Sequence, residues 1–433
     1  KYEVQVGYSG HERGFSVPLA AVALGATIIE KHFTIDKAMF GNDHKVSLLP
    51  DEFGSMVRGV RDIEESLGTK DNRKISQGEM INRENLSKSI FVNKDIKIDD
   101  VFTLDDLEVR SPGSGLKPYK INLIIGKKSF RDIKKGSMLF NSDLDVSKKD
   151  IGQFKFKRPF GIPVRYHDFN DLKTVTNIDF VEFHLSYQDL NLDAKNFIRE
   201  TNNLDFIVHS PDHFSEDHIL DFANKDKNYI ERSICELNKV CDVTREIKKI
   251  FNKKEKPMIV VNVGGFSYNN FDNIECKQEL YDDVYRNLKK VNDDDVEIIL
   301  QTMPPYPWYF GGQCYTNLFC HPDEIQLFCS KYNYRICYDV SHTMMACNLY
   351  NINLNSSITL LSELIAHMHI SDAKGVDEEG VFVGDGDVDF KSFGDNINNQ
   401  IPLIGFIPEI WQGHKNNGEG FWDALRYLQK YII

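Results

Sequence analysis

The chain has 433 residues, 41% of them hydrophobic and 12% aromatic, and a formal net charge of −13 at pH 7. This length allows about two to four domains, and the apolar content is typical of folded globular proteins. The acidic balance argues against a nucleic-acid partner, and no apolar run reaches the roughly 20 residues of a membrane span.

Residues 1–70 are predicted to form two βα units. Short strands are expected at Val4–Val6 and Ala26–Glu30, which are apolar runs bounded by turn residues. Helices are expected at Phe15–Gly25, which is rich in small apolar residues, and at Pro50–Leu67, where apolar and charged residues alternate at helical spacing. The order βαβα is typical of a parallel barrel.

Polar motifs follow both predicted strands. They read Gly7-Tyr-Ser-Gly-His11-Glu12, Ile28-Ile-Glu-Lys-His32-Phe-Thr34 and Gly41-Asn-Asp43-His-Lys-Val-Ser47. His11 and His32 are 21 positions apart, and Asp43 follows 11 positions later. Together these motifs resemble the last two units of a sialic acid synthase barrel.

That resemblance implies a role for each polar residue. Synthases of this family condense phosphoenolpyruvate with the open-chain aldehyde of an N-acylated mannosamine-like sugar. His11 and His32 would be catalytic residues that hold Mn²⁺ or Mg²⁺, Ser9 would bind the phosphoenolpyruvate, and Asp43 would bind hydroxyls of the acceptor sugar. A lone histidine at a strand end is more often a hydrogen-bonded loop residue, but the matching flanks favour the metal.

The predicted synthase part is incomplete. A (β/α)8 barrel needs eight βα units, and only two stand before residue 70. The chain also begins with Lys1 and not with methionine. We therefore expect a fragment that is inactive alone as a synthase, or a partial barrel that packs against a separate chain of about 200 residues.

A small β-rich domain is expected at residues 84–147, after a polar linker from Lys70 to Arg83. It resembles the antifreeze-like (SAF) domain of the same synthases at Arg110-Ser-Pro-Gly-Ser-Gly-Leu-Lys-Pro118, at Ile125-Gly-Lys127 and at Asp132-Ile-Lys-Lys-Gly136. The resemblance implies that Arg110 reaches the sugar in the site of a partner subunit, and hence a domain-swapped homodimer. As an alternative, Arg110 is an ordinary surface charge.

Residues 151–433 are predicted to form a second, complete (β/α)8 barrel, so that the whole chain is an α/β protein. Helical patterns separate several of eight apolar runs, which is the alternation that such a barrel requires. The predicted strands are 161–165, 180–183, 206–210, 258–263, 298–302, 336–339, 367–370 and 402–407. The predicted helices include 229–251, 279–291, 322–332 and 420–431.

Polar residues at the ends of the late strands are candidates for a metal site, because (β/α)8 enzymes build their sites there. Their order resembles the xylose-isomerase-like superfamily, which includes sugar isomerases, epimerases and nucleases and holds Mn²⁺, Mg²⁺, Co²⁺ or Zn²⁺ with Glu, Asp, His and Glu. Asp339, His369 and Glu409 fit that set, with Glu409 also catalytic, and Gln301 replaces the first glutamate. An amide oxygen can ligate a cation but cannot accept a proton, so the replacement weakens acid–base catalysis.

Further residues of the second barrel are assigned less specific roles. His209 ends the third strand, either as a substrate contact or as a hydrogen-bonded histidine. Of Glu182 and His184, we expect only one to face the core. Trp308 and Trp411, with Tyr306 and Tyr309, either stack on a sugar ring or pack in the interior. Acidic loops argue against a nuclease.

The sequence therefore predicts a cytoplasmic, bifunctional enzyme of nonulosonic acid biosynthesis. It combines part of a phosphoenolpyruvate-dependent, C–C bond-forming synthase, similar to N-acetylneuraminate synthase, with a metal-dependent sugar isomerase or epimerase. Its partners are small molecules, phosphoenolpyruvate and an N-acyl amino sugar, and neither nucleic acid nor membrane. The alternative is a non-catalytic carbohydrate-binding or scaffolding assembly with a degenerate second barrel. The eight cysteines all lie in the second half without CxxC pairs, as expected of reduced thiols.

Overall fold

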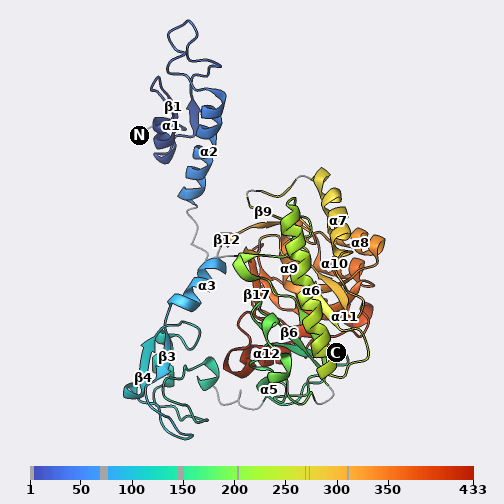
Figure 1. Ribbon diagram of the computed structural model, residues 1–433. Coiled ribbons are helices and arrows are strands. Elements are labelled where there is room, and N and C mark those ends of the chain that lie inside the picture. The colour runs from blue at the N-terminus through green and yellow to red at the C-terminus, as the bar shows by residue number, and fades with distance from the viewer. Residues whose placement is uncertain are drawn as a thin grey trace. The chain divides into compact units, whose positions relative to one another are not determined.

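The computed structural model describes residues 4–68, 77–144, 151–201, 204–268, 270–272, 274–309 and 312–433. Its Cα trace divides into two compact units, Lys1–Lys74 and Ile75–Ile433 (Figure 1). Lys1 and Lys70 lie outside the described residues, and so do the side chains of Trp308 and Tyr309. Among the helices that the structure describes, none is long and apolar enough to cross a membrane.

The first unit contains two parallel strands and two helices. Strand β1 (Gly7–Ser9) pairs with β2 (Ile28–Glu30), and the helices are α1 (Ser16–Ala23) and α2 (Pro50–Leu67). The predicted strand at Val4–Val6 is wrong by three residues, because the ladder with β2 begins at Gly7 and leaves both valines exposed. Helix α2 begins as predicted at Pro50, where the Glu52 carboxylate accepts a hydrogen bond from the Leu49 amide at 2.9 Å.

Residues 77–144 form a small β-rich region around its own core. Helix α3 (Gln77–Leu86) precedes an antiparallel pair, β3 (Ser89–Val92) and β4 (Leu107–Arg110). A short helical turn, η1 (Leu104–Asp106), lies between the two strands, and η2 (Pro118–Lys120), α4 (Ile121–Ile124) and η3 (Asn141–Leu144) follow them. The core consists of buried residues from these elements and from the loops between them, among them Ile90, Val92, Phe102, Ile124, Ile133 and Leu139.

The remainder of the second unit is a closed (β/α)8 barrel. Its eight parallel strands follow one another around the sheet in chain order, and a parallel bridge between Phe160 and Phe406 joins the last strand to the first. The strands are β5 (Gly161–Val164), β6 (Phe180–His184), β7 (Asp205–His209), β8 (Met258–Val261), β10 (Glu297–Gln301), β14 (Arg335–Asp339), β15 (Ile365–Ile370) and β18 (Phe406–Pro408). The predicted fold class and all eight predicted strands are confirmed, although β18 begins four residues later than expected.

Helices surround the strands in the ribbon (Figure 1). They are α5 (Phe169–Leu172), α6 (Lys227–Ile250), α7 (Ile274–Leu288), α8 (Pro322–Tyr332), α9 (Val340–Tyr350), α10 (Leu354–Leu361), α11 (Phe390–Gln400) and α12 (Lys415–Leu428). Short helical turns η5 (Asp189–Asn191), η6 (Ala194–Asn196) and η7 (Ser215–Asp217) lie in the loops. Small strand pairs join β9 (Phe266–Ser267) to β13 (Tyr315–Thr316), β11 (Trp308–Tyr309) to β12 (Gly312–Gln313), and β16 (Asp372–Lys374) to β17 (Glu378–Val381).

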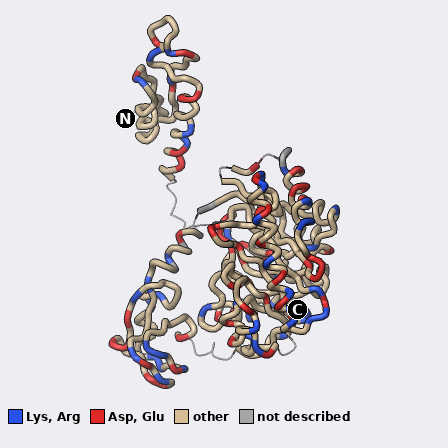
Figure 2. Tube along the Cα trace, viewed as in Figure 1, with Lys and Arg blue, Asp and Glu red and all other residues tan. Residues whose placement is uncertain are grey.

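Two hydrophobic layers hold the barrel together. The larger lies between strands and helices and includes Phe183, Phe206 and Leu237. The smaller fills the barrel interior with residues such as Ile207, Ile299 and Ile407. Each of them lies two residues before a polar residue at the strand end, so the two side chains share the inner face. Lys and Arg are interspersed with Asp and Glu along the trace (Figure 2).

Candidate functional site

Four predicted residues meet at the carboxyl ends of neighbouring barrel strands. Gln301 ends β10, Asp339 ends β14, His369 lies near the end of β15, and Glu409 follows β18. His369 Nδ1 lies 2.7 Å from Glu409 Oε2 and 3.6 Å from Asp339 Oδ2. Gln301 Nε2 lies 3.3 Å from Asp339 Oδ2 and 3.4 Å from His369 Nδ1. The structure therefore brings these residues to one point.

This donor set suits a divalent cation. Single ligand atoms of Asp339, His369 and Glu409 all lie within 4.8 Å of one another. Two carboxylates and one imidazole suit Mn²⁺, Mg²⁺, Co²⁺ or Zn²⁺, since each of these cations accepts oxygen or imidazole ligands. A half-turn of the Gln301 amide about its last side-chain bond would turn its oxygen toward the same point as a fourth donor.

A cavity of about 330 Å³ opens above these residues. Its wall includes Gln301, Asp339 and Glu409, together with His209 and Trp411 from other loops and strands. Trp411 is 46% exposed, so its indole is accessible to a ligand in the cavity. The volume is close to the lower limit of about 300 Å³ for small-molecule sites and suits a monosaccharide.

His209 ends strand β7 and is almost completely buried. Its Nδ1 contacts the carbonyl oxygen of Ser210 at 2.7 Å, and its Nε2 lies 3.3 Å from Gln301 Oε1. The ring stacks on His184 with the centroids 4.7 Å apart. It is therefore a hydrogen-bonded histidine that also lines the cavity.

The expectation that only one of Glu182 and His184 faces the core is wrong. Both point into the barrel, and Glu182 Oε1 lies 3.0 Å from His184 Nε2. The error was one of periodicity, because residues two apart on a strand share a face. Glu182 is completely buried and also contacts His367 and His369. The i, i+2 spacing of Glu182 with His184, and of His367 with His369, was the signal that could have identified this polar interior.

The charges in the site reinforce one another. Burial alone would raise the pKa of the Glu182 carboxyl, but the neighbouring His369 and His367 hold it well below its usual value. Burial likewise opposes the charged form of Glu409, yet His369 keeps its pKa below the usual range. The pKa of His369 is raised well above its ordinary value, against the effect of burial, by Cys337, Glu182 and Glu409. Glu182 and Glu409 are therefore anionic at neutral pH.

His342 and Glu379 form a pair on the cavity wall that the sequence did not indicate. His342 follows Asp339, whose Oδ1 accepts the His342 backbone N–H at 2.9 Å and so caps helix α9. His342 Nδ1 lies 2.9 Å from the Thr302 carbonyl oxygen, and its Nε2 lies 3.7 Å from Glu379 Oε2. Burial raises the pKa of Glu379 to about 7.

One carboxylate organises the loop that carries Glu379. Asp372 is completely buried and accepts hydrogen bonds from four backbone N–H groups, those of Ala373, Gly384, Gly386 and Val388, at 2.8–3.0 Å. Gly386 fits closely, since a Cβ there would lie 2.2 Å from the Ala373 carbonyl oxygen. The loop between β15 and α11 is thus fixed from within.

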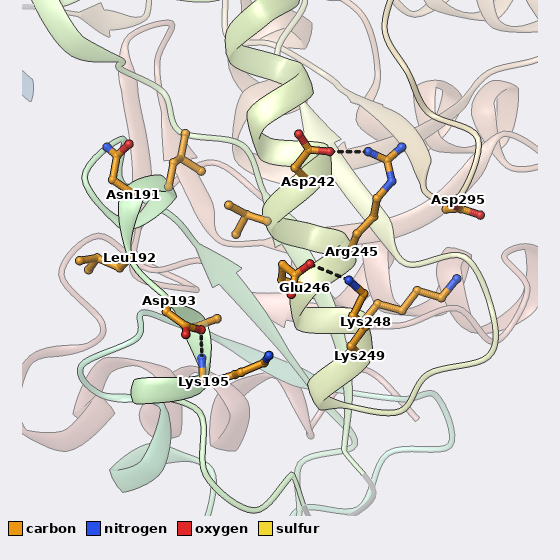
Figure 3. Close-up of a pocket in the computed structure, with 13 residues that line it drawn as sticks. Asn191, Leu192, Asp193, Lys195, Asp242, Arg245, Glu246, Lys248, Lys249 and Asp295 are labelled. Atoms are coloured by element: carbon orange, nitrogen blue, oxygen red, sulfur yellow. Dashed lines mark hydrogen bonds and ion pairs between the residues drawn. The ribbon is translucent and has the colours of Figure 1, made fainter.

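A larger hollow of about 810 Å³ lies between residues 190–195 and helix α6 (Figure 3). Its charged groups pair with each other, Asp242 with Arg245 at 2.8 Å and Glu246 with Lys249 at 2.7 Å. These pairs are mostly exposed i, i+3 neighbours on one helix and stabilise the surface only slightly. The smaller cavity at the strand ends is therefore the better candidate site.

The predicted residues of the first unit also come together. Ligand atoms of His11, His32 and Asp43 lie within 4.8 Å of one another, and the two imidazole centroids are 4.6 Å apart. Ser9 Oγ donates a hydrogen bond to Glu30 Oε2 at 2.5 Å. Arg110 belongs to the other unit, where its guanidinium donates to the Gly136 carbonyl at 2.9 Å.

Comparison with known proteins matches three parts of the chain. Residues 1–72 match the NeuB family, residues 87–145 the SAF domain, and residues 172–431 the xylose isomerase-like TIM barrel. These matches agree with the three resemblances seen in the sequence. The N-terminal third is thus homologous to sialic and pseudaminic acid synthases, and residues 172–431 are a xylose isomerase-like TIM barrel.

Two curated relatives illustrate the first third. An N,N'-diacetyllegionaminic acid synthase of Campylobacter jejuni is 38% identical over 138 residues, which cover 32% of this chain and 41% of the relative. An N-acetylneuraminate-9-phosphate synthase of Homo sapiens is 35% identical over 150 residues, 34% of this chain and 42% of the relative. The chain thus spans about two fifths of the length of these relatives. A solved structure of a D-tagatose 3-epimerase-like protein is 17% identical, with a TM-score of 0.46, and the match covers 63% of this chain and 98% of the other.

Proposed function

The chain belongs to the xylose isomerase-like TIM barrel family, and we propose that its barrel is a divalent-metal-dependent sugar isomerase or epimerase. The observation that carries this proposal is the convergence of Asp339, His369 and Glu409 beneath a cavity of about 330 Å³ at the strand ends. A cation bound there would polarise the oxygens of a sugar carbonyl and its neighbouring hydroxyl.

Glu409 is the candidate general base. Its side chain is 30% exposed on the cavity wall, and its carboxyl stays ionised beside His369. It can take the proton from the carbon next to a sugar carbonyl and return it to the adjacent carbon, which is an isomerisation on one face. Epimerisation needs a second group on the opposite face, and the Gln301 amide cannot supply that proton transfer. The site therefore favours isomerase chemistry over epimerase chemistry.

The NeuB-like segment supports a second proposed activity. Residues 1–72 would contribute His11, His32, Ser9 and Asp43 to a synthase that condenses phosphoenolpyruvate with an N-acyl amino sugar at Mn²⁺ or Mg²⁺. A (β/α)8 barrel needs eight βα units, so condensation requires the units that these residues do not supply. The domain-swapped homodimer through Arg110 and the cytoplasmic location belong to this proposal.

One observation favours a second candidate function for the barrel. Gln301 stands where a catalytic carboxylate is expected, which suits a barrel that binds carbohydrate or assembles the chain without catalysis. Measurements of bound metal and of proton exchange on the sugar distinguish an isomerase from a binding or scaffolding barrel.

The test measures metal content and solvent exchange in the same preparations. Wild type, Asp339→Asn and Glu409→Gln would be loaded with Mn²⁺, analysed for bound metal, and incubated in D2O with aldoses, ketoses and N-acyl amino sugars. Loss of the proton signal next to the carbonyl reports proton abstraction. We expect stoichiometric metal in the wild type and exchange that falls at least about 100-fold in Glu409→Gln.

Glu363→Gln, an exposed residue on the barrel surface, is the matched control and should exchange like the wild type. Bound metal without exchange on any sugar would favour the binding role. Absence of bound metal in the wild type would refute the isomerase.

A further inference from the structure

The geometry points to Glu182 as a positioning residue for the metal site: its carboxylate holds His369 through Nε2–H and so presents Nδ1 to the cation. This assignment rests on the metal site proposed above. Glu182 is not one of the proposed ligands and lies on a different strand, β6. The assignment gives a function to the buried polar residues inside the barrel.

Glu182 lies at the centre of a cluster of three histidines. His367 Nε2 lies 2.6 Å from its Oε2, His369 Nε2 lies 3.2 Å from Oε2 and 2.9 Å from Oε1, and His184 Nε2 lies 3.0 Å from Oε1. Glu182, His367 and His369 are each completely buried. A buried carboxylate is stable only when hydrogen bonds replace its water, and His367 and His369 provide them at Oε2.

The tautomer of His369 follows from this arrangement. An ionised carboxylate only accepts hydrogen bonds, so the imidazole nitrogen that faces it carries the proton. Nε2 of His369 therefore carries a proton in either form of the ring, and in the neutral ring that would bind a cation Nδ1 has the free lone pair. Nδ1 is the atom that faces Glu409 at 2.7 Å and Asp339 at 3.6 Å. Metal-ligating histidines are generally oriented by such an outer carboxylate.

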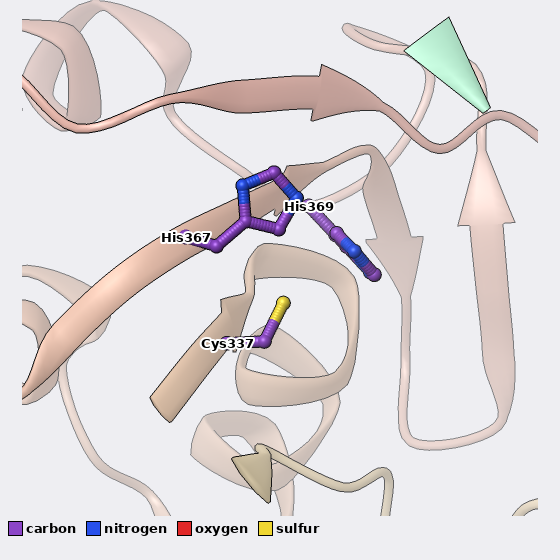
Figure 4. A group of neighbouring side chains, drawn as sticks. All are labelled: Cys337, His367 and His369. Carbon is purple, nitrogen blue, oxygen red and sulfur yellow. The ribbon is translucent and has the colours of Figure 1, made fainter. Parts of the chain in front are cut away.

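The same cluster does not fit a separate metal cage. Cys337, His367 and His369 have ligand atoms within 4.8 Å, and Figure 4 shows both rings projecting from β15 beside the thiol of Cys337. Nε2 of both rings lies at hydrogen-bonding distance from Glu182, so these two nitrogens are not available as metal ligands. The group is therefore a hydrogen-bonded cluster next to the proposed cation site.

The test is Mn²⁺ binding to the full chain by titration calorimetry, after removal of metal with a chelator. Glu182→Gln keeps the shape of the side chain and removes its charge. We expect Kd for Mn²⁺ to rise about 10- to 100-fold, as is typical when an outer carboxylate is lost. Glu236→Gln is the matched control, because Glu236 is also a buried glutamate but pairs with Lys239 on helix α6. Its Kd should stay within about twofold of the wild type, and the same result for Glu182→Gln would overturn the assignment.

A measurement on the wild type covers the case in which Glu182→Gln does not fold. Selective ¹⁵N-histidine labelling with bound Zn²⁺ identifies which imidazole nitrogen is metallated, with His369 assigned by the signal lost in His369→Asn. The assignment requires a metallated Nδ1 and a protonated Nε2, and the reverse pattern would overturn it. A wild type that binds neither Mn²⁺ nor Zn²⁺ would refute the proposed metal site as well, whereas an unchanged Glu182→Gln refutes only the role of Glu182.

Discussion

Replacing Gln301 by glutamate gives the sharpest test of the barrel site. Gln301 is 3% exposed, and its Nε2 lies 3.3 Å from Asp339 Oδ2. The substitution replaces the hydrogen bond between the Gln301 amide and the Asp339 carboxylate by a repulsive contact between two carboxylates at about the same distance. It restores the second carboxylate that acid–base chemistry on both faces of a sugar would require.

The cost in the metal-free protein can be worked from this distance. Two unit charges 3.3 Å apart repel by about 5 kcal/mol at an effective dielectric constant of about 20. The new carboxyl can avoid this cost by remaining protonated, which at pH 7 costs about 1.36 kcal/mol for each unit between 7 and its ordinary pKa of about 4.3. The loss is therefore at most about 3.7 kcal/mol, and we expect about 2–3.5 kcal/mol, or roughly 4–14 °C in Tm.

The assay is thermal unfolding in chelator and in Mn²⁺ at pH 4 and pH 7. The folded state holds the extra proton above pH 4.3, so the penalty is small at pH 4 and grows as the pH rises. Mn²⁺ should reverse it, since the cation binds the new carboxylate in the folded state only. Gln400→Glu, on the exposed end of helix α11, is the control and should change Tm little. An equal Tm for Gln301→Glu and wild type in chelator at pH 7 would show that the two side chains do not lie together.

Three further predictions concern single carboxylates of the barrel. Asp372→Ala removes the acceptor of four backbone N–H groups and should lower the free energy of unfolding by about 3–5 kcal/mol, measured by urea denaturation; a loss below about 1 kcal/mol would contradict this network. Glu379 has a pKa raised to about 7, so the folded state holds more protons than the unfolded state from about pH 4.5 to 7 and stability falls across that range. Glu379→Gln in chelator should therefore gain about 1–3 kcal/mol over the wild type between pH 4.5 and pH 8, and a gain independent of pH would refute it. Asp339→Asn should keep the cap of helix α9 and lose Mn²⁺ affinity, whereas Asp339→Ala should lose both and about 0.5–2 kcal/mol of stability.

Most of the barrel was predictable because its strands are buried on both faces. Such strands contain continuous apolar runs, as in Met258–Val261 and in residues 298–300 of Glu297–Gln301, and the polar residue that follows each run was visible in the sequence. The strand at Val4–Val6 was misplaced because an apolar run does not show at which residue its hydrogen bonds with the neighbouring strand begin.

The sequence by itself determined the local elements and their order. It indicated Gln301, Asp339, His369 and Glu409 as a set, because each lies at the end of a predicted strand and their order resembles the xylose-isomerase-like superfamily. Only the tertiary structure decided what surrounds His369. Glu182 lies 187 positions before it in the chain, and no local pattern relates the two. Closure of the sheet between Phe160 and Phe406 places β6 across the barrel interior from β15, and this brings the carboxylate to the imidazole. Contacts between distant strands depend on register and closure, which arise only when the whole barrel packs.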